Sequence, residues 1–207
     1  MNKNKTLILV RHAPVKKVDG YIPKNNPSAL INLDHMQKLA NYIPEASSCY
    51  VSPLKRTIQT AKALSKFVNF EDITEAKDLV EQNFGDWAGK RISDVWEELK
   101  HNKSQHIFSF ICPEICPPNG DSYLDQCKRV ANFIDNFNFE NKNSVVLITH
   151  AGTIRAILSH ILEIEPDKSI GIEISHLSCT LIEVINKNHH NHRGGRYRLL
   201  KVNQQII

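Results

Sequence analysis

Two short apolar runs, far apart in the chain, constrain its fold more than any other feature. The first reads LILV and ends in Arg11-His12, and the second reads VVLI and ends in Thr149-His150. Each has the length and composition of a buried strand. If the two strands are neighbours in one parallel sheet, both histidines lie in the crevice beyond the carboxyl ends of the strands, where open α/β sheets bind ligands.

Helix-like and strand-like patterns alternate along the rest of the chain. This alternation predicts one three-layer α/β/α domain over residues 1–207, with a mostly parallel central sheet and an antiparallel edge strand. We expect a lid or insertion at about residues 88–120, where the pattern is less regular. Asp121 or Ser122 is the expected N-cap of the longest helix. The helices are expected over residues 35–42, 54–67, 92–100, 122–137 and 153–162, and the strands over 6–10, 48–52, 71–76, 144–149, 176–185 and 196–202.

Composition and charge narrow the class of protein. The 207 residues are 41% hydrophobic and 23% charged, as in ordinary soluble globular proteins. The net charge of +4 favours anionic partners, but no long basic run indicates nucleic-acid binding. The apolar run near the N-terminus is too short for a signal peptide or a membrane span. We therefore expect a cytoplasmic protein whose five cysteines are reduced.

Two further charged residues are candidates for chemistry. Arg56 lies in the segment SPLKR, directly after the second predicted strand, and Glu81 lies in the segment EQNFGDWAG. That segment contains too many glycines and aromatic residues for a helix. Taken alone these residues are unspecific, because a histidine at a strand end is usually structural and a loop carboxylate is usually solvated.

Together, five segments resemble the histidine phosphatase superfamily, which also contains the cofactor-dependent phosphoglycerate mutases. In chain order they read LVRH, SPLKRTIQTA, EQNFGDWAG, GDS and THAGTIR, and the resemblance extends from Leu7 to about Ile185. It implies a phosphoglycerate mutase-like fold and a metal-independent reaction through a phosphohistidine. It implies no cofactor, since guanidinium and imidazole groups can supply the positive charge that phosphoryl transfer needs.

The resemblance also implies roles for particular residues. The nucleophile is a neutral histidine, with a backbone carbonyl holding the N–H of its other ring nitrogen. A carboxylic acid protonates the leaving group. The implied catalytic residues are His12 as nucleophile, Glu81 as proton donor and His150 as a further donor, and the implied phosphate-binding groups are Arg11, Arg56 and the backbone N–H groups of Ala151 and Gly152.

The loop after the first histidine departs from the family pattern. Ala13-Pro14 stands where the family often has Gly-Glu, and Val18 stands where it commonly has an asparagine that binds phosphate. Proline has no N–H to donate, so this loop has lost donors. Lys16 or Lys17 could compensate through its charge, although two solvated lysines are an equally good interpretation.

The segment after Glu81 favours the phosphatase branch over the mutases. Among phosphatases the resemblance is greatest to α-ribazole phosphatases, and an apolar lid wall containing Phe108, Phe110 and Ile111 would suit an aromatic riboside. Sugar phosphates, nucleotides, a phosphohistidine protein and a non-catalytic phospholigand-binding module stay open as alternatives. The expected partners are a small phosphomonoester and inorganic phosphate as product. The three histidines of residues 189–192 are interpreted as part of an exposed hairpin loop rather than a metal site.

Overall fold

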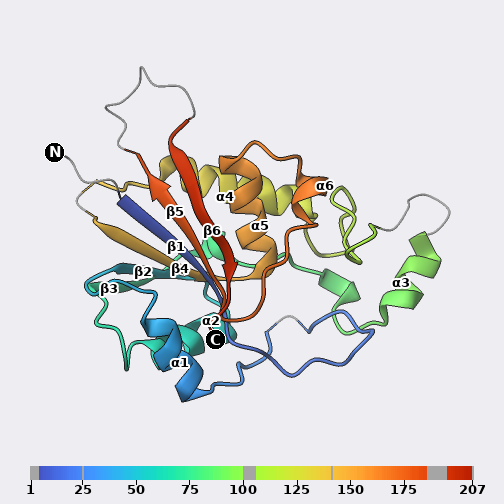
Figure 1. Cartoon of the computed structure of the whole chain (residues 1–207). Helices are drawn as coiled ribbons and strands as arrows, with labels where there is room; N and C mark the ends of the chain where they lie inside the picture. Colours follow the sequence, from blue (N-terminus) through green and yellow to red (C-terminus); the bar gives the residue numbers. More distant parts are fainter. Residues whose placement is uncertain (1–4, 25, 100–105, 141, 186–194, 207) are drawn as a thin grey trace.

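A single twisted sheet forms the centre of the protein (Figure 1). The computed structural model describes residues 5–24, 26–99, 106–140, 142–185 and 195–206. Within these ranges six strands lie in the order β3-β2-β4-β1-β5-β6. The pairs β3–β2, β2–β4 and β4–β1 are parallel, whereas β5 and β6 extend the sheet in antiparallel fashion. Their bounds are Lys5–Arg11 (β1), Ser48–Val51 (β2), Asp72–Glu75 (β3), Ser144–Thr149 (β4), Cys179–Val184 (β5) and Tyr197–Gln204 (β6).

Helices cover both faces of this sheet, which confirms the predicted three-layer architecture. Alternate residues of β1 separate the two cores: Leu7 and Leu9 pack toward α4 and α5, and Ile8 and Val10 pack toward α1 and α2. Figure 1 shows these two pairs of helices on opposite sides of the strands. The helices are Leu33–Ala40 (α1), Lys55–Leu64 (α2), Ile92–Leu99 (α3), Tyr123–Asn136 (α4), Ala151–Ile161 (α5) and Pro166–Ser169 (α6).

The helix boundaries differ from the predictions in informative ways. Ser122, not Asp121, is the N-cap of α4, and it forms a capping box with Asp125. Helix α5 begins at Ala151, two residues earlier than predicted, because His150 is the N-cap residue and its carbonyl accepts the first helical bond from Ile154. The short helix α6 was not predicted, since a four-residue helix has no recognisable apolar period.

The register of the parallel strands brings together the residues that directly follow β1, β2 and β4. Arg11 pairs with Thr149, and Val51 pairs with Ile148, so β1, β2 and β4 end at nearly the same level. The backbone N–H of His12 donates to the carbonyl of Thr149 at 2.9 Å. The residue that follows each strand, His12, Ser52 or His150, therefore lies at one edge of the sheet.

The segment just before the region predicted as a lid, residues 88–120, meets the end of that region closely. A Cβ on Gly85 would lie 2.0 Å from the carbonyl oxygen of Pro118, and one on Gly120 would lie 2.3 Å from that of Asn83. Only glycine permits this approach, and Gly85 also has a positive φ of 47°. Helix α3 follows and lies to one side of the sheet in Figure 1. The histidines of residues 189–192 lie outside the described residues.

Two further expectations concern the whole chain. All five cysteines are free thiols, as predicted. Among the helices of the described ranges, none is long and apolar enough to cross a membrane.

Candidate active site

The two strand-end histidines face each other across one guanidinium group. The ring centroids of His12 and His150 lie 5.1 Å apart, and both side chains are buried. The Nε–H of Arg56, from the first turn of α2, donates to Nε2 of His12 at 3.1 Å and to Nδ1 of His150 at 3.2 Å. Both of these ring nitrogens therefore present a lone pair toward Arg56, and the predicted juxtaposition of the strands is confirmed.

The second nitrogen of each ring distinguishes the two histidines. Nδ1 of His12 lies 2.7 Å from the carbonyl oxygen of Ala13, which can only accept, so this nitrogen carries the proton and Nε2 keeps its lone pair. Nε2 of His150 lies 2.8 Å from the hydroxyl oxygen of Ser52, which can donate or accept. His12 is thus locked in the tautomer of a nucleophile, whereas His150 can change tautomer and present an N–H.

Both histidines are held neutral by their surroundings. Burial and the neighbouring His150 lower the pKa of His12 far below its ordinary value. Burial, Arg56 and Arg11 lower the pKa of His150 well below the ordinary value too. A neutral imidazole keeps a lone pair on one ring nitrogen and can act as a nucleophile without a further base.

The neutral histidines should make folding stability fall in mild acid. In the unfolded chain a histidine binds a proton near pH 6.5, whereas folded His12 and His150 do not. The unfolded state therefore binds more protons as the pH falls below about 6.5, and each histidine should lower the free energy of unfolding by about 1.4 kcal/mol per pH unit. Urea unfolding between pH 7 and pH 5 measures this slope.

The control for this prediction is His12→Ala, which removes one of these groups; His176, whose pKa burial lowers to about 4, adds to the slope in both proteins. In the variant the free energy of unfolding should change less steeply with pH, by about 1.4 kcal/mol per pH unit, because one titrating histidine is gone. Carboxyl groups, whose ordinary pKa is near 4, contribute little between pH 7 and pH 5. A free energy of unfolding that is constant from pH 7 to pH 5, or an unchanged slope in the variant, would contradict it.

Two arginines supply positive charge beside the histidines. Burial lowers the pKa of Arg11 to about 10, with Glu81 opposing the shift, so this guanidinium stays charged at neutral pH. Its Nη1 donates to the carbonyl of Ile174, and its Nε has no partner among the residues that the structure describes. Burial also lowers the pKa of Arg56, again opposed by Glu81. The charge of Glu81 therefore raises the pKa of both arginines and opposes the effect of burial.

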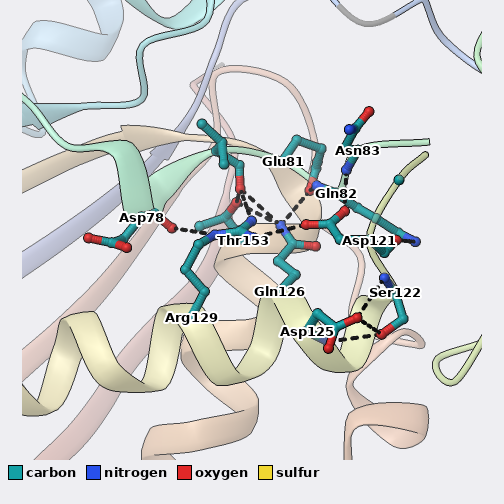
Figure 2. Close-up of polar contacts among 12 residues, drawn as sticks. Asp78, Glu81, Gln82, Asn83, Asp121, Ser122, Asp125, Gln126, Arg129 and Thr153 are labelled. Carbon is teal, nitrogen blue, oxygen red and sulfur yellow. Dashed lines mark hydrogen bonds and ion pairs between the residues drawn. The ribbon is translucent and has the colours of Figure 1, made fainter. Parts of the chain in front are cut away.

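The Glu81 carboxylate is fixed by donors from two helices and its own loop, and Figure 2 shows the bond from Gln126. Nε2 of Gln126 on α4 donates to Oε1 at 2.8 Å, the backbone N–H of Gly152 on α5 donates to Oε2 at 3.1 Å, and that of Gln82 donates to Oε1 at 3.3 Å. The predicted phosphate donor Gly152 thus serves Glu81 instead. The physical reason is close approach, because a Cβ on Gly152 would lie 2.3 Å from Oε1 of Glu81.

A third histidine, which sequence reasoning missed, lies against His12. Nδ1 of His176 lies 3.0 Å from the carbonyl oxygen of His12, and the two ring centroids are 5.1 Å apart. Leu177, with a positive φ of 58°, turns the chain here and donates its N–H to the carbonyl of Arg11. Burial and then the charge of Arg11 lower the pKa of His176 to about 4. The only sequence signal was a histidine at the first position of the strand predicted over residues 176–185, and the observed strand β5 begins at Cys179.

Lys17 shares the electrostatic field of the site. Partial burial and the charge of Arg11 lower the pKa of Lys17, and Lys17 in turn contributes to the lowered pKa of His176. Arg155 on α5 also lowers the pKa of Arg11, while its own Nε donates to the carbonyl of Ile172 at 2.7 Å. The site is therefore strongly cationic, with Glu81 as its counter-charge.

The predicted apolar wall is only partly formed. Phe110 packs on Phe84, three residues after Glu81, with ring centroids 5.4 Å apart. Phe108 is instead 74% exposed, although its ring lies near Gly171. Asp121, which replaces a glutamate of the family pattern, accepts from the N–H of Asn83 and pairs with Arg129 at 2.9 Å, so it ties the Glu81 loop to α4.

Comparison with known proteins agrees with this geometry. The chain is 26% identical to a 2,3-bisphosphoglycerate-dependent phosphoglycerate mutase from Thermoplasma acidophilum, over 87% of this chain and 88% of the relative. It is 25% identical to phosphoserine phosphatase 1 from Hydrogenobacter thermophilus, over 86% of each chain. The structure of an α-ribazole phosphatase from Shigella flexneri shares the fold, with a TM-score of 0.73 and 19% identity over 98% of both chains. The family model of the histidine phosphatase superfamily (branch 1) matches residues 7–194, and the chain belongs to this superfamily.

Proposed function

We propose that this protein hydrolyses a small-molecule phosphomonoester without a metal, through a phosphohistidine on Nε2 of His12. The observation that carries the proposal is the state of His12. The carbonyl of Ala13 holds its Nδ1–H, so the Nε2 lone pair faces the guanidinium of Arg56. A phosphoryl group bound by Arg56 would meet this lone pair directly, which is the positioning that phosphoryl transfer requires.

The proposed reaction has two steps with balanced proton transfers. In the first, Nε2 of His12 forms a bond to phosphorus while the bond from phosphorus to the ester oxygen breaks, and the acid form of Glu81 protonates the departing oxygen. In the second, water attacks phosphorus, the N–P bond breaks, and the Glu81 carboxylate takes a proton from the water. Arg11 and Arg56 stabilise the phosphoryl oxygens throughout. Inorganic phosphate leaves, and His12 returns to its neutral state.

In this proposal His150 and Ser52 adapt to the phosphoryl group. When the Ser52 hydroxyl donates to Nε2 of His150, the ring carries its proton on Nδ1 and can donate to a phosphoryl oxygen. Ala151 lies at the start of α5, where a backbone N–H can assist. Lys17 adds charge at the loop that lacks the family's donors.

The substrate is proposed to be α-ribazole 5′-phosphate or another small ester, and the segment after His12 supports a choice of compounds to test. Residues 15–18 and 21–24 line a cavity of about 420 Å³, with Tyr21 and Ile22 among its apolar walls and Lys17 among its cations. The apolar walls suit the aromatic base of α-ribazole. The cations suit the carboxylate of phosphoserine, the substrate named for one relative. Sugar phosphates, nucleotides and a phosphohistidine protein are the other candidates.

A hydrolysis screen in the presence of EDTA tests the proposal. The compounds are α-ribazole 5′-phosphate, phosphoserine, 3-phosphoglycerate, sugar phosphates, nucleotides and p-nitrophenyl phosphate. We expect phosphate release that survives EDTA, together with an acid-labile, alkali-stable phosphoenzyme. Conversion of 3-phosphoglycerate to its 2-isomer without phosphate release would favour a mutase. Vanadate binding without any turnover would favour a phospholigand-binding module.

A further inference from the structure

A buried glutamine, Gln126, occupies a core position of helix α4. The other buried residues of this helix, Tyr123, Val130 and Ile134, follow the helical period, and Gln126 stands among them with no exposed surface. A buried amide costs free energy unless its polar atoms are bonded, so a glutamine here needs a local reason. Figure 2 shows that reason: the Gln126 side chain points from α4 toward Glu81 and Thr153.

The side-chain nitrogen of Gln126 has three possible hydrogen-bond acceptors, and two of them are closer than the third. Nε2 lies 2.8 Å from Oε1 of Glu81, 3.0 Å from Oγ1 of Thr153 and 3.3 Å from the carbonyl oxygen of Val80. The Val80 carbonyl already accepts from Arg129 at 3.0 Å. Because the amide has two N–H groups, the shorter contacts to Glu81 and Thr153 use both of them. Gln126 is therefore fixed between α5 and the carboxylate.

The amide oxygens of Gln126 and Gln82 are both buried and have no hydrogen-bond partner among the described residues. Of these two side-chain amides, only that of Gln126 donates to the Glu81 carboxylate. A half-turn of the Gln126 amide about its last bond would exchange its oxygen with Nε2. The oxygen could then accept from the O–H of a protonated Glu81, while the Thr153 hydroxyl keeps donating to the carbonyl of Val80 at 3.1 Å. One side chain can thus pair with either protonation state of Glu81.

We propose that Gln126 is a positioning residue that holds the Glu81 carboxyl group in both of the protonation states that catalysis requires. This inference rests on the proposed function, in which Glu81 is an acid in the first step and a base in the second. In the ionised state the amide donates to Oε1, as in the structure. In the protonated state the rotated amide accepts the acid proton until Glu81 releases it to the leaving oxygen.

Kinetics of Gln126→Met with two substrates of different leaving groups test the proposal. Phosphoserine has an alkoxide leaving group that needs a proton, whereas p-nitrophenolate leaves without one. We expect kcat for phosphoserine to fall about 10- to 100-fold and kcat for p-nitrophenyl phosphate to fall less than about threefold. Gln126→Leu, which is apolar and no larger than glutamine, should show the same selectivity and serves if the methionine variant folds poorly.

Gln82→Met is the matched control. Gln82 is also a buried amide of the same network, but its Nε2 donates to the carbonyl of Asp121 at 2.9 Å and not to Glu81. Its substitution should lower kcat for the two substrates by similar factors. In the Glu81→Gln background, Gln126→Met should cost less than about twofold more for phosphoserine, because a residue that acts through Glu81 has nothing left to position.

Three results would overturn the inference: equal losses on both substrates, no loss at all, or losses that multiply in the double variant. Failure of the proposed function has a different signature. There the wild-type protein forms no phosphoenzyme, or His12→Ala keeps its activity, whatever Gln126→Met does. If His12 proves essential and Gln126→Met is unselective, only the role of Gln126 is wrong.

Discussion

His12→Ala is expected to lower kcat for p-nitrophenyl phosphate by at least about 10⁴-fold and to abolish the phosphoenzyme. Alanine offers no nucleophile, and the other ring nitrogen at Arg56, Nδ1 of His150, belongs to a histidine whose tautomer Ser52 does not fix. Vanadate affinity should change much less, because Arg11, Arg56 and His150 remain. Steady-state kinetics and trapping with radiolabelled substrate measure the two effects.

His176→Asn is the control for His12→Ala. Its ring lies as close to His12 as that of His150 does, but its Nδ1 contacts only the backbone carbonyl of His12. The asparagine side chain can also donate to that carbonyl, so we expect a loss below about tenfold. If His12→Ala retained more than about 1% of wild-type activity, or if the phosphoenzyme persisted in it, the nucleophile would be a different residue.

The strand-end histidines were predictable because their signal is local. A short apolar run such as LILV, followed by a segment rich in Pro and Lys, indicates a buried strand, and parallel strands bring their carboxyl ends to one edge. The pairing of β1 with β4 then places His12 beside His150. The three-layer fold followed from the same alternation of strands and helices.

The partners of Glu81 were not predictable in this way. The spacing in α4 predicts an apolar stripe that contains Leu124, Cys127, Val130 and Ile134. Val130 and Ile134 are buried as expected, but in the first turns Tyr123 and Gln126 are buried in place of Leu124 and Cys127. Such a small shift of the buried face costs little and is decided by packing, which no sequence period records. Gly152 was correctly placed at the start of a helix, but which acceptor its N–H meets depends on the loop of Glu81.

The distribution of charge explains why Glu81 matters so much in this site. Arg11, Arg56 and Lys17 act on the same small space, and the histidines between them are neutral. These groups can bind and stabilise a phosphoryl group, but a guanidinium group holds its proton and the histidines are neutral. In the proposed mechanism the proton for the leaving group therefore comes from Glu81.

Glu81→Gln is accordingly expected to lower kcat about 10²- to 10⁴-fold for phosphoserine, and much less for p-nitrophenyl phosphate.

Gly152→Ala should reproduce this selectivity with Glu81 intact. Its Cβ would lie 2.3 Å from Oε1 of Glu81, and the carboxylate, as the end of a flexible side chain, would move away with little loss of stability. Glu81→Gln removes the carboxyl group, whereas Gly152→Ala only displaces it. Comparing the two variants on both substrates therefore shows whether catalysis depends on the position of the carboxyl group as well as on its presence. If Glu81→Gln lowered kcat equally for both substrates, Glu81 would act on the phosphoryl group rather than on the leaving oxygen. If only Gly152→Ala were unselective, the carboxyl group would be needed but its contact with α5 would not.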